Sequence, residues 1–260
     1  MNFELPFIPE RSAKPRDTGL TMMMDKGLSV AEAENFTASS SGFTDLAKFG
    51  FGTALIASDL KVKINVYKQA GIRPYFGGTL FEAFIIRDMF EDYRRIVDEF
   101  NLEVIEISDG SMAMPHEEKL KYINILSKQV LVLSEVGYKV AGKIIPPEKW
   151  VAMMKTELEE GAWKVIAEAR ESGTVGIYNK DGSANAGLIN EILGNVHPED
   201  VLWEAPDKSQ QVWFIKLLGA NVNLGNIAPH EVVALETLRL GMRGDTFFDF
   251  LPEGYKERKL

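Results

Sequence analysis

The chain has 260 residues, of which 45% are hydrophobic and 26% are charged, and its formal net charge is −9. This length and composition fit one complete globular domain with a sizeable apolar core. The acidic balance argues against wholesale binding to nucleic acid or to an anionic membrane surface. Because the sequence contains no cysteine, disulfides, thiolate metal sites and cysteine nucleophiles are excluded.

The beginning of the chain mixes charges with prolines and lacks the continuous apolar core of a signal peptide. No stretch of the sequence approaches the roughly 18 apolar residues of a membrane span. We therefore expect a cytoplasmic protein without a membrane partner, whose N-terminal segment packs across the bottom of the fold.

Eight short apolar or glycine-bearing runs recur along the chain, most of them followed by a polar turn and a helical pattern. They begin near Thr21, Leu46, Arg73, Val104, Val130, Trp163, Val201 and Ala220. Amphipathic segments lie between them, and the segment 79–100 predicts a helix with Phe81, Phe84, Ile85, Met89 and Ile96 on one face. Buried strands that alternate with such helices indicate a parallel sheet covered by helices.

Eight such units predict an α/β protein folded as a single (β/α)8 TIM barrel over residues 21–245. Residues 1–20 would form an N-terminal extension and residues 246–260 a C-terminal tail. An open doubly wound sheet is the alternative. Its nucleotide-binding version is disfavoured, because no GxGxxG follows the first run and the sequence has no P-loop.

Charged residues gather where the runs end. Five of the eight runs carry acids there: Asp25, Glu106 with Asp109, Glu135, Glu168 with Glu171, and Glu204. The basic residues that join them are Lys26, Lys48, Lys139, Arg170 and Lys208. Buried charge costs several kcal/mol unless it is paired, solvated or bound to a metal. In a barrel these ends form one rim, where barrel enzymes have their sites; a ring of structural salt bridges is the alternative reading.

Glycines add a second signal at the strand ends. The eighth run ends in Asn223-Leu224-Gly225-Asn226, and barrels often bind phosphate in the loops after their seventh and eighth strands. An ordinary tight turn is the alternative for this loop. The three histidines lack the HxH and HExxH spacings of zinc sites, whereas the rim carboxylates suit Mg²⁺, which prefers oxygen ligands.

At these strand ends the sequence resembles the phosphosulfolactate synthases, in segments that span most of the chain in the order of the family. The matching segments are GLTMMMDKGL (19–28), KFGFGTALI (48–56), GGTLFE (77–82), EISDGSM (106–112), SEVGYK (134–139), EARESGT (168–174), EAPDKSQQVWFI (204–215) and VNLGNIAPHEVVALETLRLGMRGDT (222–246). The resemblance implies a Mg²⁺-dependent barrel enzyme that adds sulfite to phosphoenolpyruvate, giving (2R)-phospho-3-sulfolactate. In methanogens that reaction opens one route to coenzyme M.

The resemblance and the charge pattern together suggest roles for the rim residues. We expect Lys139 to deliver a proton to C2 of the substrate, with Lys48 as its main rival. Glu106, Glu135 and Glu168 follow three successive runs and would hold Mg²⁺, with Asp25 as the reserve ligand.

The remaining rim residues are assigned to the two anions, phosphoenolpyruvate and sulfite. Arg170, Ser172, Asn223, Gly225 and Asn226 would bind phosphate, and Lys26 or Lys208 would steer sulfite. We also expect a homo-oligomer.

Two other functions fit the same residues. One is a barrel lyase or mutase that acts on another phosphorylated enolate, including a Schiff-base aldolase with Lys48 as the nucleophile. The other is a barrel that has lost catalysis and acts through binding or assembly.

Overall fold

The computed structural model describes residues 3–137, 145–169 and 172–259. Its sheet has eight parallel strands in the order β3-β2-β1-β8-β7-β6-β5-β4. The strands are β1 (Thr21–Asp25), β2 (Leu46–Phe49), β3 (Arg73–Phe76), β4 (Val104–Ile107), β5 (Leu131–Val136), β6 (Lys164–Ala167), β7 (Val201–Glu204) and β8 (Leu224–Ile227). The first and last strands, β1 and β8, pair with each other, so the sheet curls back on itself.

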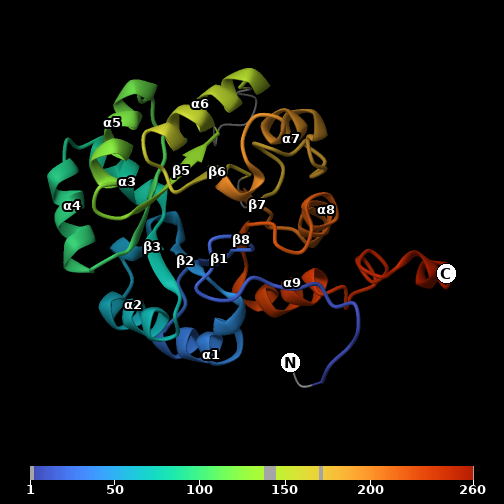
Figure 1. Cartoon of the computed structure of the whole chain (residues 1–260). Coiled ribbons are helices and arrows are strands. Elements are labelled where there is room, and N and C mark those ends of the chain that lie inside the picture. Colours follow the sequence, from blue (N-terminus) through green and yellow to red (C-terminus); the bar gives the residue numbers. More distant parts are fainter. Residues whose placement is uncertain (1–2, 138–144, 170–171, 260) are drawn as a thin grey trace.

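The sheet forms a nearly closed barrel with helices around its outside (Figure 1). β3 and β4, both fully described, lie next to each other without a hydrogen-bonded ladder between them. The (β/α)8 prediction is confirmed. The eighth strand begins at Leu224 rather than near Ala220, because residues 219–223 form the turn that leads into it.

Helices follow each strand and cover the outer face of the sheet, except the last short helix, which has no buried residue. They are α1 (Val30–Ser40), α2 (Leu60–Gln69), α3 (Gly78–Ile85), α4 (Phe90–Glu99), α5 (His116–Leu126), α6 (Pro147–Glu159), α7 (Ala186–Leu193), α8 (Lys208–Leu218), α9 (Val232–Arg239) and α10 (Glu253–Lys256). Short 3₁₀ turns span Ser41–Phe43, Gly50–Leu55, Pro198–Asp200 and Pro229–Glu231. The prediction of one helix over 79–100 is wrong: Asp88 has a φ of 57°, which breaks the helix between α3 and α4.

Side chains alternate between the two faces of each strand, and this creates two cores. The larger core lies between the sheet and the helices. The smaller core fills the inside of the barrel with one layer of side chains: Met22, Leu46, Tyr75, Val104, Leu133, Ile166 and Leu202. Gly225 completes this layer on β8, because a Cβ there would lie 2.7 Å from Met22 Cε.

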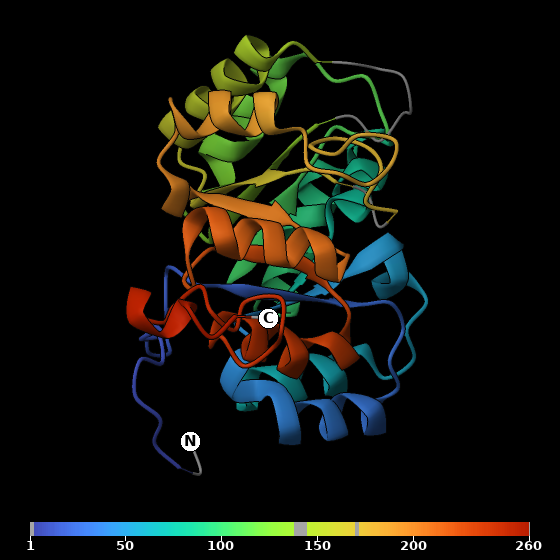
Figure 2. The ribbon, with the colours of Figure 1, turned by 90° about the vertical axis from the view of Figure 1, so that its right-hand side faces the viewer.

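Buried arginines close the end of the barrel where the strands begin. Arg239 of α9 donates to the carbonyls of Leu20, Ala220 and Val222, which directly precede β1 and β8. Arg11, from the N-terminal segment, donates to the carbonyls of Gly19 and Ala220 and pairs with Glu236 at 2.9 Å. In Figure 2 this blue segment lies at that end of the molecule. The strand starts are thus held by guanidinium groups bonded to backbone carbonyls.

Among the helices in the described ranges, none combines the length and the apolar character that a membrane crossing requires.

Candidate active site

A cavity of about 380 Å³ opens at the carboxyl-terminal ends of the strands. Its described lining consists of Met24, Lys48, Phe51, Gly77, Gly78, Thr79, Glu106, Glu135, Glu168, Ser172, Glu204 and Asn226. Within that lining, one lysine faces four glutamates, and all five side chains are buried. The position matches the end of a barrel at which enzymes of this fold place their chemistry.

Strand periodicity brings these charges together. Each charged residue comes two positions after an inner-core residue of the same strand: Lys48 after Leu46, Glu106 after Val104, Glu135 after Leu133, Glu168 after Ile166, and Glu204 after Leu202. Because side chains two residues apart share one face of a strand, the charged layer sits directly above the apolar layer inside the barrel. The apolar layer therefore forms the floor of a charged cavity.

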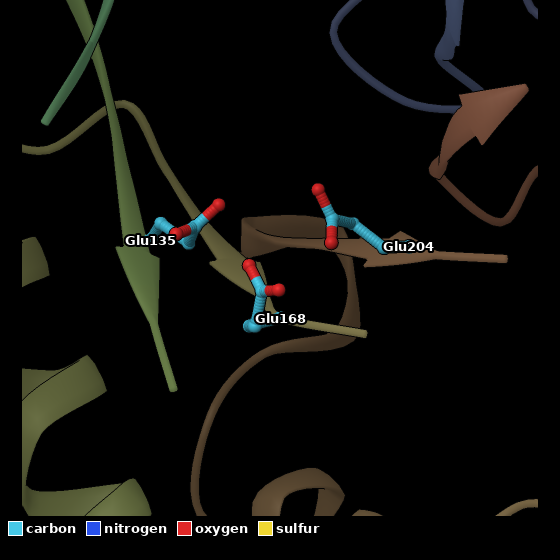
Figure 3. Close-up of side chains that lie close together, drawn as sticks. All are labelled: Glu135, Glu168 and Glu204. Atoms are coloured by element: carbon cyan, nitrogen blue, oxygen red, sulfur yellow. The ribbon is translucent and has the colours of Figure 1, made fainter. Parts of the chain in front are cut away.

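Three glutamates form a buried acidic cluster from three neighbouring strands. Glu135 lies in β5, Glu168 directly follows β6, and Glu204 ends β7. Each offers a carboxylate oxygen, and these oxygens lie within 4.8 Å of one another. Figure 3 shows the three carboxylates converging from their strands. Such a cluster could hold a metal ion, and its oxygen-only donors favour a hard cation.

Lys48 lies close to Glu106 and to two members of this cluster. Its Nζ lies 2.9 Å from Glu106 Oε2, 3.4 Å from Glu204 Oε1 and 3.8 Å from Glu135 Oε2. Burial alone lowers the pKa of Lys48, but the carboxylates of Glu106, Glu204 and Glu135 outweigh it, so the pKa is well above its ordinary value. Lys48 is therefore a fixed cation at the centre of the acids.

Two hydrogen bonds hold Glu204, one to its side chain and one to its backbone carbonyl. Its Oε2 accepts a hydrogen bond from the backbone N–H of Ala169 at 3.0 Å, and its carbonyl accepts one from the Tyr178 hydroxyl at 2.7 Å. Burial raises the pKa of the Glu204 carboxyl to about 7, and repulsion from Glu135 and Glu106 adds to this, although Lys48 acts in the opposite sense. Glu204 is therefore harder to ionise at this position than an exposed glutamate.

Glu106 is anchored to the start of α3. Its Oε1 accepts a hydrogen bond from the Gly78 N–H at 2.6 Å. A Cβ at Gly78 would lie 2.6 Å from Ser108 Cβ and 2.9 Å from Glu106 Oε1, so the close approach of helix and strand requires glycine here. Glu82, one turn further along α3, accepts hydrogen bonds from the Ser108 hydroxyl and from the Ser111 N–H. These contacts fix α3 against the end of β4.

Residues 9–245 match the family model described as (2R)-phospho-3-sulfolactate synthase (ComA). The chain belongs to the phosphosulfolactate synthase family. The phosphosulfolactate synthases of Bacillus subtilis (strain 168) and Methanothermobacter thermautotrophicus are each 41% identical to it over 244 residues. These alignments cover 93% and 92% of this chain, and 97% and 95% of the relatives.

A solved structure supports the fold. The 3-hexulose-6-phosphate synthase from Salmonella typhimurium superposes with a TM-score of 0.55 and covers 86% of this chain and 100% of its own, at 13% identity. At that identity the likeness concerns the barrel and not the reaction. The assignment to the phosphosulfolactate synthases therefore depends on the sequence relatives.

In this family member the acids group differently from the expected set Glu106, Glu135 and Glu168. The structure brings Glu135 and Glu168 together with Glu204, while Glu106 lies outside that cluster and pairs with Lys48 at 2.9 Å. The sequence interpretation overlooked Glu204 as a ligand. Its position two residues after the apolar Leu202 was a signal that could have identified it.

Asp25, the expected reserve ligand, lies outside the cavity lining. Met22 and Met24 face the barrel interior, so Asp25 points outward to the helices. There it pairs with Lys63 at 3.0 Å, accepts a hydrogen bond from the Tyr67 hydroxyl at 2.8 Å and caps the Gly27 and Leu28 N–H groups. Its carboxylate is thus engaged in a structural network.

The three residues predicted to bind phosphate in the eighth-strand loop do not lie together. Asn223 precedes β8 and bonds to Leu20 N, Glu199 O and Val201 O, at the end opposite the cavity. Gly225 lies inside the barrel, and Asn226 alone of the predicted three lines the cavity. A register shift between β1 and β8 and a φ of 58° at Asn226 turn this side chain inward, where its Oδ1 is buried and has no hydrogen-bond partner among the described residues.

The other predicted anion-binding residues that the structure describes lie at or beyond the cavity mouth. Ser172 lines the cavity and is exposed. Lys26 is exposed too, with its Nζ 5.9 Å from the centre of the Phe51 ring, which also lines the cavity. Lys208 lies at the surface, paired with Asp245 at 2.8 Å. Lys139 and Arg170 fall outside the described residues.

Proposed function

We propose that this chain catalyses the Mg²⁺-dependent addition of sulfite to phosphoenolpyruvate, giving (2R)-phospho-3-sulfolactate. One observation carries the proposal for this family member: a buried cluster of three carboxylates stands beside a buried, protonated lysine in an open cavity. Two polyanionic substrates need cations in their pocket, and this arrangement supplies one lysine and a place for a metal ion.

The donor set fits Mg²⁺. Glu135, Glu168 and Glu204 offer oxygen atoms, buried and close together, and the raised pKa of Glu204, caused first by burial, reflects unfavourable charge that a divalent cation would relieve. When bound, Mg²⁺ would stabilise the negative charge that develops on the substrate carboxylate as sulfite adds.

Lys48 would act on the substrate as a cation. In the reaction the sulfur lone pair of sulfite forms a bond to C3 of phosphoenolpyruvate, the double-bond electrons move toward C2 and the carboxylate, and a proton is then added at C2. A protonated lysine held by three glutamates is positioned to attract the anionic substrate and to stabilise that charge.

The source of the C2 proton is a choice between two lysines. We retain Lys139 as the expected donor, with Lys48 as its rival. Ser172 and Asn226 are proposed to bind the phosphate group, because both line the cavity and the amide of Asn226 is buried there. Arg170 would contribute to the same binding, and Lys26 at the mouth would attract sulfite.

A Schiff-base reaction at Lys48 is disfavoured. A lysine nucleophile must be neutral, which requires a lowered pKa. Although burial acts in that direction, the neighbouring glutamates raise the pKa of Lys48 well above its ordinary value. Borohydride trapping with a carbonyl substrate is therefore expected to leave the protein mass unchanged.

The deciding experiment is incubation of the protein with phosphoenolpyruvate, sulfite and Mg²⁺, followed by mass spectrometry and phosphorus NMR. We expect a sulfonated phospho-acid that disappears with EDTA and returns when excess Mg²⁺ is added. If no such product exceeds the control without protein, the proposed reaction is wrong and a binding role for the barrel becomes the better hypothesis.

A further inference from the structure

A second buried lysine lies behind the acidic cluster. Lys119 of α5 has no solvent exposure, and its Nζ donates to the backbone carbonyl of Glu135 at 2.6 Å. The same ammonium group pairs with Glu157 of α6 at 2.9 Å and with Asp109 of the β4–α5 loop at 3.1 Å. Lys119 therefore joins β5, both neighbouring helices and the loop that follows β4.

The strand ladder explains why Glu135 needs this donor. The β4–β5 ladder ends where Ile107 pairs with Ser134, so the carbonyl of Glu135 lies one residue beyond it. A buried carbonyl without a donor is costly, and the Lys119 ammonium replaces the N–H that β4 no longer supplies. The backbone at Glu135 is thus fixed by a side chain rather than by a neighbouring strand.

We propose that Lys119 is a positioning residue that holds the Glu135 carboxylate in place as a metal ligand. This inference rests on the proposed function, because it presumes a cation in the cluster of Glu135, Glu168 and Glu204. Lys119 itself lies between the sheet and the helices, outside the cavity lining. Groups that orient metal ligands from behind are known to set metal affinity although they do not touch the metal.

Lys119 stays protonated in this position. Burial lowers its pKa, but Glu157 and Asp109 outweigh that effect and raise the pKa above its ordinary value. The ammonium group keeps its three protons and has three acceptors: one carbonyl and two carboxylates. Its removal would leave two buried acids without their cation and the Glu135 carbonyl without its donor.

The test compares Lys119→Met with Arg239→Met. Arg239 is equally buried and also donates to backbone carbonyls, but it does so at the opposite end of the barrel. Binding of Mn²⁺ as a probe is measured by electron paramagnetic resonance, without substrates, on the folded protein. We expect Lys119→Met to weaken Mn²⁺ binding about 10- to 100-fold and Arg239→Met to leave it within about 2-fold.

Kinetics supply the second readout. For Lys119→Met the Mg²⁺ concentration that gives half-maximal rate should rise, while kcat at saturating Mg²⁺ returns toward the wild-type value. Wild-type Mn²⁺ affinity in folded Lys119→Met would overturn the inference and leave the proposed function intact. Failure of the wild-type protein to bind Mn²⁺ would instead refute the metal part of the proposed function, and the inference with it.

A neutral triple variant covers the case in which Lys119→Met does not fold. Lys119→Met with Asp109→Asn and Glu157→Gln removes all three charges together, so no unpaired ion remains buried. It still lacks the donor to Glu135, and weakened Mn²⁺ binding is expected again. Wild-type Mn²⁺ affinity in this variant would also overturn the inference.

Discussion

The two ends of the barrel bury charge in opposite ways. At the end where the strands begin, Arg239 donates to three backbone carbonyls and Arg16 pairs with Asp45 at 2.9 Å. At the other end, Lys48 lies within 4 Å of Glu106, Glu135 and Glu204. Cations are matched by acceptors at the first end, whereas acids exceed cations in the described lining of the second.

This difference distinguishes the end of the barrel whose buried charges stabilise the fold from the end whose buried charges suit a functional site. A buried charge is tolerated when hydrogen bonds and opposite charges compensate it. The arginines have carbonyl and carboxylate partners, although burial and the neighbouring Arg11 lower the pKa of Arg239 to about 9. Among the described residues acids outnumber cations around Lys48, and burial together with Glu135 and Glu106 raises the pKa of the Glu204 carboxyl. An arrangement that costs stability in the free protein and suits a bound cation is typical of a functional site.

The largest effect is expected from Lys48→Met. Loss of this cation removes the electrostatic partner of the substrates, and kcat/KM should fall about 10³-fold. The assay is formation of the sulfonated phospho-acid, with circular dichroism to confirm that the variant is folded. Turnover near the wild-type value in a folded Lys48→Met protein would show that the centre of the cavity is not the reaction centre.

Two matched acid substitutions should change stability in opposite directions. Glu204 has a folded pKa of about 7, above its ordinary value of 4.5, because of burial first and of Glu135 and Glu106 second. Folding therefore favours the protonated carboxyl, and metal-free wild-type protein should lose stability as pH rises from about 4.5 to about 7. At pH 8, Glu204→Gln should raise the free energy of unfolding by about 2 kcal/mol, and this gain should vanish below pH 4.5.

The matched substitution at the end of the barrel where the strands begin is Glu236→Gln. Glu236 is the partner of Arg11 at 2.9 Å and of Arg239 at 4.0 Å, so its neutralisation should lower the free energy of unfolding by about 1–3 kcal/mol. Urea denaturation of both variants in EDTA gives the comparison. Shifts of the same sign would contradict the distinction between the two ends.

The smallest effect is expected from Lys208→Ala. Its ion pair with Asp245 is half exposed, and such surface pairs contribute about 0–1 kcal/mol. Since Lys208 lies outside the cavity lining, kcat/KM should stay within about 2-fold of wild type. A decrease of about 10-fold or more, measured at several sulfite concentrations, would restore the sulfite-steering role that the sequence suggested.

The fold could be predicted because each strand carries its own signal. Runs such as the one at Val104 are apolar over a few residues and are followed by helices; this pattern predicts a parallel sheet covered by helices, and eight such units favour a barrel. The prediction of a single helix over 79–100 failed because the apolar spacing continues through Asp88, while the backbone turns there with a φ of 57°. The spacing of apolar residues indicates which face of a helix is buried, but it does not indicate where the helix ends and the next one begins.

The sequence predicted which residues belong to the site better than it predicted how they are arranged. Glu135 and Glu168 were identified from their place at strand ends, and the structure brings them together. Asp25 sits one residue out of phase with the inward side chains of β1, so it faces the helices. Asn226 reaches the cavity through a register shift between β1 and β8, which involves two segments about 200 residues apart in the chain and leaves no local pattern.

The sequence by itself determined the alternation of buried strands and helices, and with it the charged layer that stands above an apolar floor. That layer follows from a period of two along each strand, which is a local property. The tertiary structure alone decided that Glu204 joins Glu135 and Glu168, that Glu106 pairs with Lys48, and that Lys119 donates to the backbone near the end of β5. The distances between these charged residues, their burial and their pKa values depend on segments that are remote in the chain. These properties therefore arise only when the strands have come together in the barrel.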